Sequence, residues 1–315
     1  MSEKHRLLNF YGEPPVYQLF VSIMMILGVG FILASILIVA GSGIFGTDIN
    51  VLTKSAESLT VNDIRFIRYT LIIQDISFLF IPAIILMLLM KRPGSKLTEL
   101  KIPDIKEIGL VILLTICIFP VSSFTGQINS AIHLPSWLSG VERWMIEKEQ
   151  SADNLIDSIV VSDTFGMMLL NLVIIALIPA ISEEMIFRGV LQRIFTRIFK
   201  SGHFAIFFTA IFFSTIHFQF LGFIPRVILG LIFGYLFFWG RTLWLPIVSH
   251  FVNNAFPVIM TYVQGLEKTD ATPDFPLWKQ AIFLPIPIGV IIVILFYIRN
   301  RNINPLTPSN TKSGV

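Results

Sequence analysis

The sequence predicts an all-α protein, a polytopic membrane helical bundle with about eight transmembrane helices. Of its 315 residues, 54% are hydrophobic and only 14% are charged, whereas soluble globular proteins contain about 25% charged residues. The mean hydropathy is +0.78. So few charges cannot cover the surface of a water-soluble monomer, and a disordered chain would be polar and rich in charge. The composition therefore excludes both of these classes.

Eight apolar runs are candidates to cross a bilayer, which requires about 20 residues each. In chain order they are 17–41, 69–90, 108–130, 164–187, 203–220, 223–240, 243–263 and 280–298. The fifth and sixth runs are short and nearly continuous, so they can form a tight helical hairpin. In the sixth run Gly230 and Gly234 form a Gly-x-x-x-Gly pattern, which predicts close helix packing.

The longest stretch that is not apolar is 131–163, which contains Trp137 and Trp144. We expect it to be an interfacial amphipathic loop with tryptophans at headgroup level, and a role in gating substrate is the alternative. Three regions follow from this pass along the chain: 1–163 with the first helices and this loop, 164–263, and 264–315 with the last helix and a polar tail.

Most lysines and arginines follow the even-numbered runs or lie near the termini, as Arg188, Arg193, Arg197 and Lys200 do after the fourth run. Positive residues stay on the cytoplasmic side, so both termini are predicted to be cytoplasmic in a cell membrane, with 131–163 outside. The basic residues form no single patch, so we expect the lipid bilayer as a partner and no nucleic acid. The single cysteine, Cys117, allows neither a disulfide within the chain nor a cysteine-based metal site.

Ionisable side chains at membrane depth are costly and mark functional sites. Glu184 and Arg188 are four residues apart, so they share a helix face and can form an ion pair. Glu183 points about 100° away from Glu184 and is left free to face a cavity. Two adjacent carboxylates in different environments suit a structural role for one and a basic role for the other. The alternative is that all three side chains are solvated at the cytoplasmic interface.

Three further polar residues lie in apolar runs. His250 and Asn254 are four residues apart and can point at one cavity, whereas Asn253 is rotated away and is expected to serve helix packing. His217 ends the fifth run, where a lone histidine is usually a packed residue. Asp75, in the second run, is interpreted as a supporting, proton-pathway or outer-interface residue outside the main site.

This set of residues favours hydrolysis by an activated water. Glutamate and histidine can act as general base and acid, and an asparagine amide or a histidine N–H can stabilise an oxyanion. Alternatively, Glu183, His217 and His250 are candidate ligands of a catalytic zinc. No Gly-x-Ser-x-Gly elbow and no His-Glu-x-x-His helix occur, which disfavours a serine hydrolase and a zincin-like protease.

Three motifs within 164–263 resemble those of the CPBP intramembrane proteases, also called the Abi or CAAX prenyl protease 2 family. The motifs are Glu183-Glu184-x-x-x-Arg188, Phe213-x-x-x-His217 and His250-x-x-x-Asn254. The resemblance implies that 164–263 is the catalytic core of a helical membrane endopeptidase. Its substrate would be a membrane-associated peptide or protein, and its site would open towards the cytoplasm.

The resemblance also implies a role for each motif residue. Glu183 is expected to activate the water with help from His217, while His250 and Asn254 bind the oxyanion. The second glutamate and the arginine of the first motif are expected to orient the site. The flanking residues resemble the bacterial form of the family, so a bacterial origin is expected, and the prenylated CAAX substrate need not carry over.

Two other classes of function remain as alternatives. A membrane scaffold or bacteriocin-immunity protein would keep the motifs but act by binding a partner. A small transporter would use Glu183, His217 and His250 as a proton relay. The transporter is disfavoured because the sequence shows no inverted repeat and no paired broken helices.

Overall fold

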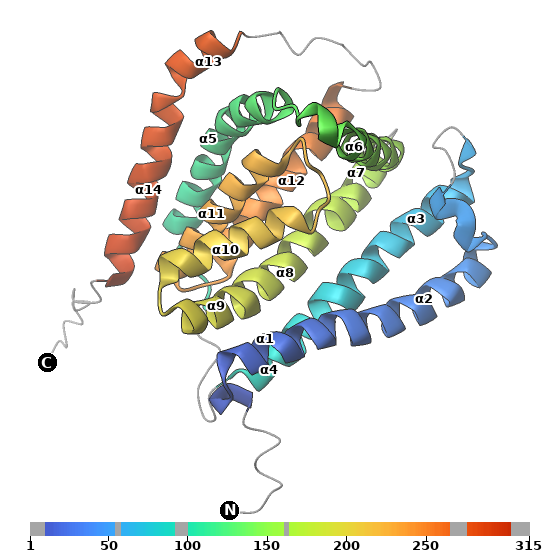
Figure 1. Ribbon diagram of the computed structural model, residues 1–315, viewed down its shortest axis with the longest axis horizontal. Helices are drawn as coiled ribbons and strands as arrows, with labels where there is room; N and C mark the ends of the chain where they lie inside the picture. The colour runs from blue at the N-terminus through green and yellow to red at the C-terminus, as the bar shows by residue number, and fades with distance from the viewer. Residues whose placement is uncertain (1–9, 54–57, 92–99, 161–163, 265–275, 304–315) are drawn as a thin grey trace, which may run out of the picture.

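The computed structural model describes residues 10–53, 58–91, 100–160, 164–264 and 276–303. Every regular element within these ranges is a helix. Long helices run side by side across the molecule, and the N-terminal pair packs along one flank of the remaining bundle (Figure 1). The all-helical prediction is confirmed for the described part of the chain.

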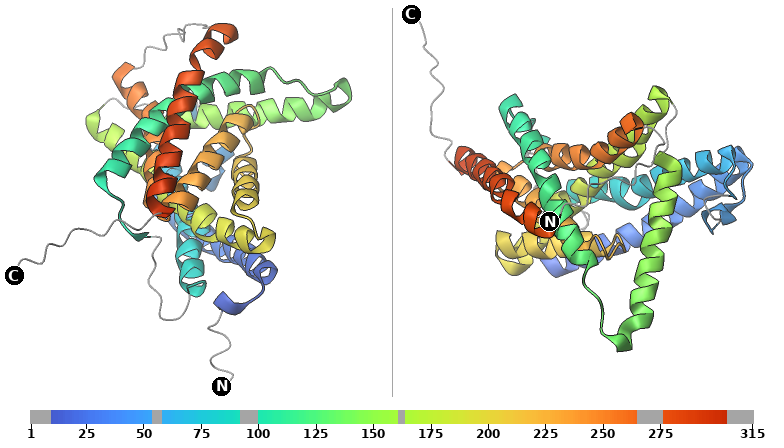
Figure 2. Two further views of the ribbon diagram at one scale, coloured as in Figure 1. Left: turned by 90° about the vertical axis from the view of Figure 1, so that its left-hand side faces the viewer. Right: turned by 90° about the horizontal axis from the view of Figure 1, so that it is seen from above.

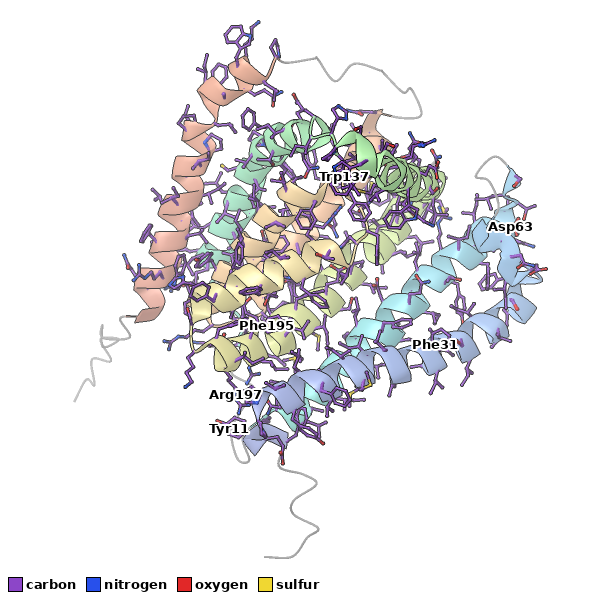
Figure 3. All side chains as sticks on the ribbon, viewed as in Figure 1. Tyr11, Phe31, Asp63, Trp137, Phe195 and Arg197 are labelled. Carbon is purple, nitrogen blue, oxygen red and sulfur yellow. The ribbon has the colours of Figure 1, made fainter. Side chains whose placement is uncertain are left out.

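The N-terminal pair consists of two long antiparallel spans. The first runs through α1 (Pro15–Met24), a π-helical segment and α2 (Gly30–Phe45), and the second through α3 (Val61–Gln74), a π-helical segment and α4 (Ile81–Leu89). The two spans approach closely where Gly41 faces Tyr69, since a Cβ atom there would lie only 2.2 Å from the Tyr69 ring. The opposite side of α2 is apolar and exposed, as Phe31 illustrates (Figure 3).

The third span, α5 (Ile105–Ser130), leads into α6 (Ser139–Val160). The expectation that 131–163 is a loop is therefore wrong for α6, which is a 22-residue helix. Its charged residues alternate with apolar ones at helical spacing, a pattern that suits a helix with one apolar face. The connection between α5 and α6 projects from one face of the bundle (Figure 2).

The fourth span is the longest, with 35 residues from Phe165 to Phe199. It passes through α7 (Phe165–Asn171), a π-helical segment, α8 (Ile178–Glu184), a second π-helical segment and α9 (Gln192–Phe199). At 1.5 Å per residue it is about 50 Å long, well beyond the roughly 30 Å of a bilayer core. The glutamates expected near the end of this run therefore lie near its middle.

Within the described ranges, five more helices complete the bundle, of which the short α13 directly precedes α14. They are α10 (Gly202–Thr215), α11 (Phe223–Gly240), α12 (Trp244–Gln264), α13 (Leu277–Phe283) and α14 (Pro285–Ile303). The expected hairpin of the fifth and sixth runs is formed by α10 and α11. A Cβ atom on Gly230 would lie 3.0 Å from the Ala210 backbone, and one on Gly234 would lie 2.7 Å from Ile206. The prediction of close packing at these glycines is confirmed.

Within the described ranges, five helical segments are long and apolar enough to cross a membrane, or six if α13 and α14, which are bent by 40°, form one span. Among the remaining helices, α10 has only 14 residues, and α12 includes the polar residues His250, Asn253 and Asn254. The chain is thus a multi-pass membrane protein, but the count of eight spans is not confirmed. Of the expected polar tail, residues 304–315 lie outside the described ranges.

Several helix ends meet at one end of the bundle. Arg197, in α9, donates a hydrogen bond to Gln18 of α1 at 2.6 Å and lies over the Tyr11 ring (Figure 3). Arg301 of α14 pairs with Asp104 at the start of α5, 2.8 Å away. The start of α1 and the end of α14 therefore share the end of the bundle opposite α6. The side of the membrane on which this end lies stays a prediction.

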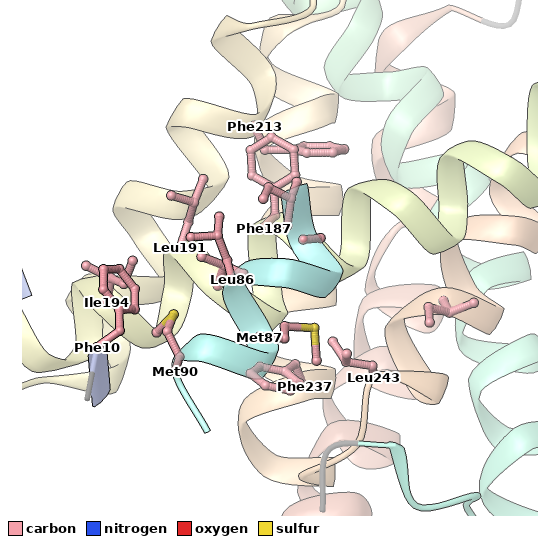
Figure 4. Packing of buried hydrophobic residues seen from close by; sticks show 14 residues of the cluster. Phe10, Leu86, Met87, Met90, Phe187, Leu191, Ile194, Phe213, Phe237 and Leu243 are labelled. Carbon is pink, nitrogen blue, oxygen red and sulfur yellow. The ribbon is translucent and has the colours of Figure 1, made fainter. Parts of the chain in front are cut away.

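One apolar cluster joins the N-terminal pair to the other helices (Figure 4). Leu86 and Met87 of α4 pack with residues of the fourth span, α10 and α12. Within it the rings of Phe187 and Phe213 meet edge to face, with centroids 5.0 Å apart. This cluster lies directly beneath the polar residues of the motifs and fixes the helices that carry them.

Candidate active site

A buried ion pair forms the base of the site. Glu184 Oε1 accepts a hydrogen bond from Arg188 Nη1 at 2.8 Å, and both side chains are fully buried. Arg188 also donates to the carbonyl of Gly230 at 3.2 Å and lies over the Phe213 ring, 4.9 Å from its centroid. The ion pair expected from the i, i+4 spacing is present, in the protein interior. The interpretation that these groups are solvated at an interface is wrong.

His250 is bound to the same glutamate. Its Nδ1 lies 2.9 Å from Glu184 Oε1, and its ring stacks on Phe233 with centroids 5.1 Å apart. Because a carboxylate only accepts hydrogen bonds, Nδ1 must carry the proton. The Nε2 atom of His250 therefore points away from Glu184 and towards Glu183.

Glu183 faces the two histidines. Its Oε2 atom lies 3.8 Å from His217 Nε2 and 3.9 Å from His250 Nε2, and its side chain is 13% exposed. This oxygen is buried and accepts no hydrogen bond from the described residues. Separations of this size are too long for direct hydrogen bonds but suit a bridging water. As expected, the two neighbouring glutamates have different environments.

His217 is oriented in the same way as His250. Its Nδ1 lies 2.7 Å from the carbonyl oxygen of Phe213, so this nitrogen also carries the proton. Both imidazoles are thus fixed by an acceptor on Nδ1, and both present Nε2 to Glu183. When both histidines are neutral, the lone pairs of their Nε2 atoms and the Oε2 atom of Glu183 point towards one common position.

These groups line a cavity of about 650 Å³. Asn254 is part of its wall and donates a long hydrogen bond to the Ile175 carbonyl at 3.4 Å. Asn253, which was expected to point away, lines the cavity as well and donates to Asn254 Oδ1 at 3.1 Å. Two positions one apart on a helix are about 100° apart, and the cavity is wide enough to contact both.

Two charged residues of the cavity wall were missed or set aside in the sequence. Asp75 lies at the start of the π-helical segment of the second span and interacts electrostatically with Glu183. Arg226 of α11 also lines the cavity and donates to Gln219 Oε1 at 2.6 Å. Asp75 could have been included because ionisable residues within apolar runs are functional candidates. Arg226 gave the same signal, because it lies within the sixth apolar run, 223–240.

The cavity extends from Glu183 towards the α6 end of the bundle. Ile156 of α6 and Gln219, between α10 and α11, both line it. The predicted orientation places α6 outside the cell, whereas the family resemblance implies a site open to the cytoplasm. Both expectations stay predictions.

No group of three His, Cys, Asp or Glu side chains in the described ranges is arranged to hold a metal ion. Glu183, His217 and His250 nevertheless offer the donor chemistry that zinc prefers. Their separations of 3.8 and 3.9 Å exceed the roughly 3.4 Å between neighbouring ligands of tetrahedral zinc. The donor set therefore fits zinc in kind, and the spacing would have to contract by a few tenths of an ångström.

Comparison with known proteins identifies a family that is similar to part of the chain. Residues 165–256 match the family model described as type II CAAX prenyl endopeptidase Rce1-like. No curated protein and no solved structure matches the chain. The matched residues include all three motifs and exclude the N-terminal pair, α6 and α14. Over residues 165–256, slightly less than a third of its length, the chain is therefore similar to the Rce1-like family of CAAX prenyl endopeptidases.

Proposed function

We propose that the protein is an intramembrane endopeptidase that hydrolyses a peptide bond of a membrane-associated substrate with a water activated by Glu183. The observation that carries the proposal is the convergence on Glu183 Oε2 of two histidine Nε2 atoms at 3.8 and 3.9 Å. This buried carboxylate oxygen has no hydrogen-bond partner among the described residues. Such a group at membrane depth costs free energy, so its presence indicates a functional site.

In the proposed reaction, a water lies between Glu183 Oε2 and His217 Nε2. Glu183 takes a proton from this water as the oxygen attacks the carbonyl carbon of the scissile bond. His217 Nε2 accepts a second hydrogen bond from the water and aligns it. The proton then passes from the Glu183 carboxyl to the leaving amine, which completes the cleavage of the C–N bond and restores the base.

The oxyanion of the tetrahedral intermediate is assigned to His250 and Asn254. Since Glu184 holds the proton on His250 Nδ1, His250 can donate through Nε2 only as an imidazolium. The Asn254 amide supplies a second donor, because its Nδ2 atom carries two protons and only one is used by Ile175.

Zinc at the same atoms is the second candidate, and one observation favours it. Both histidines have Nδ1 fixed by an acceptor, an arrangement typical of zinc-binding histidines, which coordinate through the other nitrogen. Bound by Glu183, His217 and His250, zinc would supply a water of lowered pKa. The roles of Glu184 and Arg188 in orienting His250 are the same in either case.

The proposal is tested by cleavage in proteoliposomes. A prenylated CAAX peptide is the first substrate, because the family description names this class, and an unprenylated peptide and a single-span peptide follow. Glu183→Gln should abolish product formation, measured by mass spectrometry, while the protein stays folded. Glu147→Gln, an exposed glutamate of α6, is the matched control. Wild-type activity of Glu183→Gln would refute the role of this residue.

Elemental analysis of the purified protein separates the two candidates. About one zinc per chain, lost in both His217→Ala and His250→Ala, would support the metal site. Full cleavage activity after dialysis against a chelator, in a sample without zinc, would support the glutamate base alone. A protein that cleaves none of the peptides but binds one tightly would support the scaffold alternative.

A further inference from the structure

The segment that follows His217 has an unusual conformation. Residues 216–222 join α10 to α11 without regular helix, and Phe218 has a positive φ of 51°. A bulky residue in this left-handed region is strained by about 1–3 kcal/mol and persists only where surrounding contacts hold it. The position of His217, at the start of this segment, therefore depends on those contacts.

One such contact comes from α6. The carboxylate of Glu149 accepts a hydrogen bond from the backbone N–H of Leu221, with Oε2 and N 2.7 Å apart. The ring of Trp144, one turn earlier in α6, lies against Phe220 with centroids 5.5 Å apart. Glu149 is 9% exposed, so its carboxylate is held inside the protein at this contact.

A second anchor comes from the end of α5. Asn129 Nδ2 donates to the Phe220 carbonyl at 2.8 Å, and Asn129 Oδ1 accepts from Ile224 N–H at 2.8 Å. Glu149 and Asn129 thus bind the same short segment from two different helices. Both helices lie outside the residues that match the Rce1-like family.

The segment also separates two cavities. Gln219 and Gly222 line the catalytic cavity, while Phe220 and Leu221 line a second cavity of about 500 Å³ beneath α6. A segment with empty space on its far side is not held there by close packing. Its hydrogen bonds must therefore supply much of the restraint.

Glu149 also acts on the segment through charge. It interacts electrostatically with Arg226 of α11, and Arg226 also interacts electrostatically with Glu183. Arg226 donates to both the backbone carbonyl and the side chain of Gln219. Removing the Glu149 side chain would therefore disturb the segment at Leu221 and at Gln219.

We propose that Glu149 is a positioning residue of the active site, through which α6 holds the 216–222 segment and so fixes His217 against Glu183. This inference rests on the proposed endopeptidase function, since it assigns His217 to the alignment of the attacking water. It assigns to α6 a part in catalysis that the matched family segment does not include.

The test compares two substitutions of Glu149 by cleavage kinetics in proteoliposomes. Glu149→Ala should lower kcat about 10- to 100-fold with KM little changed, because misplacement of a reacting group by about 1 Å can cost about 100-fold. Glu149→Gln should recover most of this loss, because its amide oxygen can still accept from Leu221 N–H. Glu147→Ala, an exposed neighbour on the same helix, should behave as wild type.

A purely structural role for Glu149 would give lower yield or thermal stability with an unchanged kcat per folded molecule. Should Glu149→Ala fail to fold, Trp144→Ala is the second variant, since it loosens the same segment from a half-exposed position and leaves the charges in place. It should lower kcat in the same way. Wild-type kcat in Glu149→Ala, or in Trp144→Ala where the first is unfolded, would overturn the inference. If Glu183→Gln is inactive in the same assay, the proposed function survives this failure.

Discussion

Substitution of Arg188 by alanine tests the division of roles between the two glutamates. The change removes the 2.8 Å bond to Glu184 and the 3.2 Å bond to Gly230. It leaves Glu184 as a fully buried carboxylate without its cation. Breaking a buried pair in this way costs about 3–5 kcal/mol. Glu183→Gln removes no hydrogen bond within the described residues, so its cost should be below about 1 kcal/mol.

Thermal unfolding in detergent provides the measurement. One kcal/mol shifts Tm by about 2–4 °C in domains of 150–250 residues, so Arg188→Ala should lower Tm by at least about 6 °C. Glu183→Gln should shift it by no more than about 4 °C. Glu184→Gln should resemble Arg188→Ala, because it leaves the arginine buried and unpaired.

The double variant Glu184→Gln/Arg188→Ala provides the internal control. Because it leaves neither charge unpaired, its loss of stability should be smaller than the sum of the two single losses. The reasoning is refuted if Arg188→Ala and Glu183→Gln lower Tm equally, or if the double variant is simply additive. Either result would mean that the pair is more hydrated than the structure indicates.

Three further outcomes are expected. Asp75→Asn should lower kcat, because it removes a carboxylate that lines the cavity beside Glu183. Thermal stability should be unchanged or raised, because an intramembrane carboxylate is removed; lower stability would argue for a structural role. Gly230→Ala should lower stability by about 1–3 kcal/mol in thermal unfolding, because the new methyl group meets the α10 backbone at 3.0 Å, and a neutral effect would contradict this packing. The hydrogen bond from Arg301, with one from the Lys106 backbone, lowers the pKa of Asp104. This contact therefore stabilises the fold above about pH 4, and the stabilisation is lost as the pH falls through the lowered pKa. The Tm difference between wild type and Asp104→Asn should shrink at acidic pH, and a constant difference would rule out a contribution of this contact.

Local spacing was sufficient to predict the central part of the site. An i, i+4 pair on a helix meets wherever the helix is placed, so the ion pair between Glu184 and Arg188 followed from the sequence. The angle of about 100° between neighbouring positions also predicted that Glu183 would face elsewhere. These features depend on one helix only, and tertiary structure does not alter them.

Features that depend on several helices could not be predicted in this way. The wall position of Asn253 and the proximity of Asp75 to Glu183 arise from packing between distant spans. Arg226 lies near the start of the sixth run, and hydropathy alone does not show that this part of the helix lines the cavity. Hydropathy also ended the fourth run at 187, because the amphipathic α9 that continues it is not apolar enough to be included.

The polar contact between α1 and α9 has a consequence for how the chain is assembled during synthesis. Gln18 is fully buried in the finished protein, yet its partner Arg197 is 179 residues later. At about 5–20 residues per second, the ribosome needs roughly 10–35 s to make that partner. For the later part of this interval the first two spans are already available to the membrane, with an amide that lacks its final contact. The N-terminal pair must therefore be tolerated by lipid or by the insertion machinery as an independent hairpin, and it docks only after the fourth span has been made.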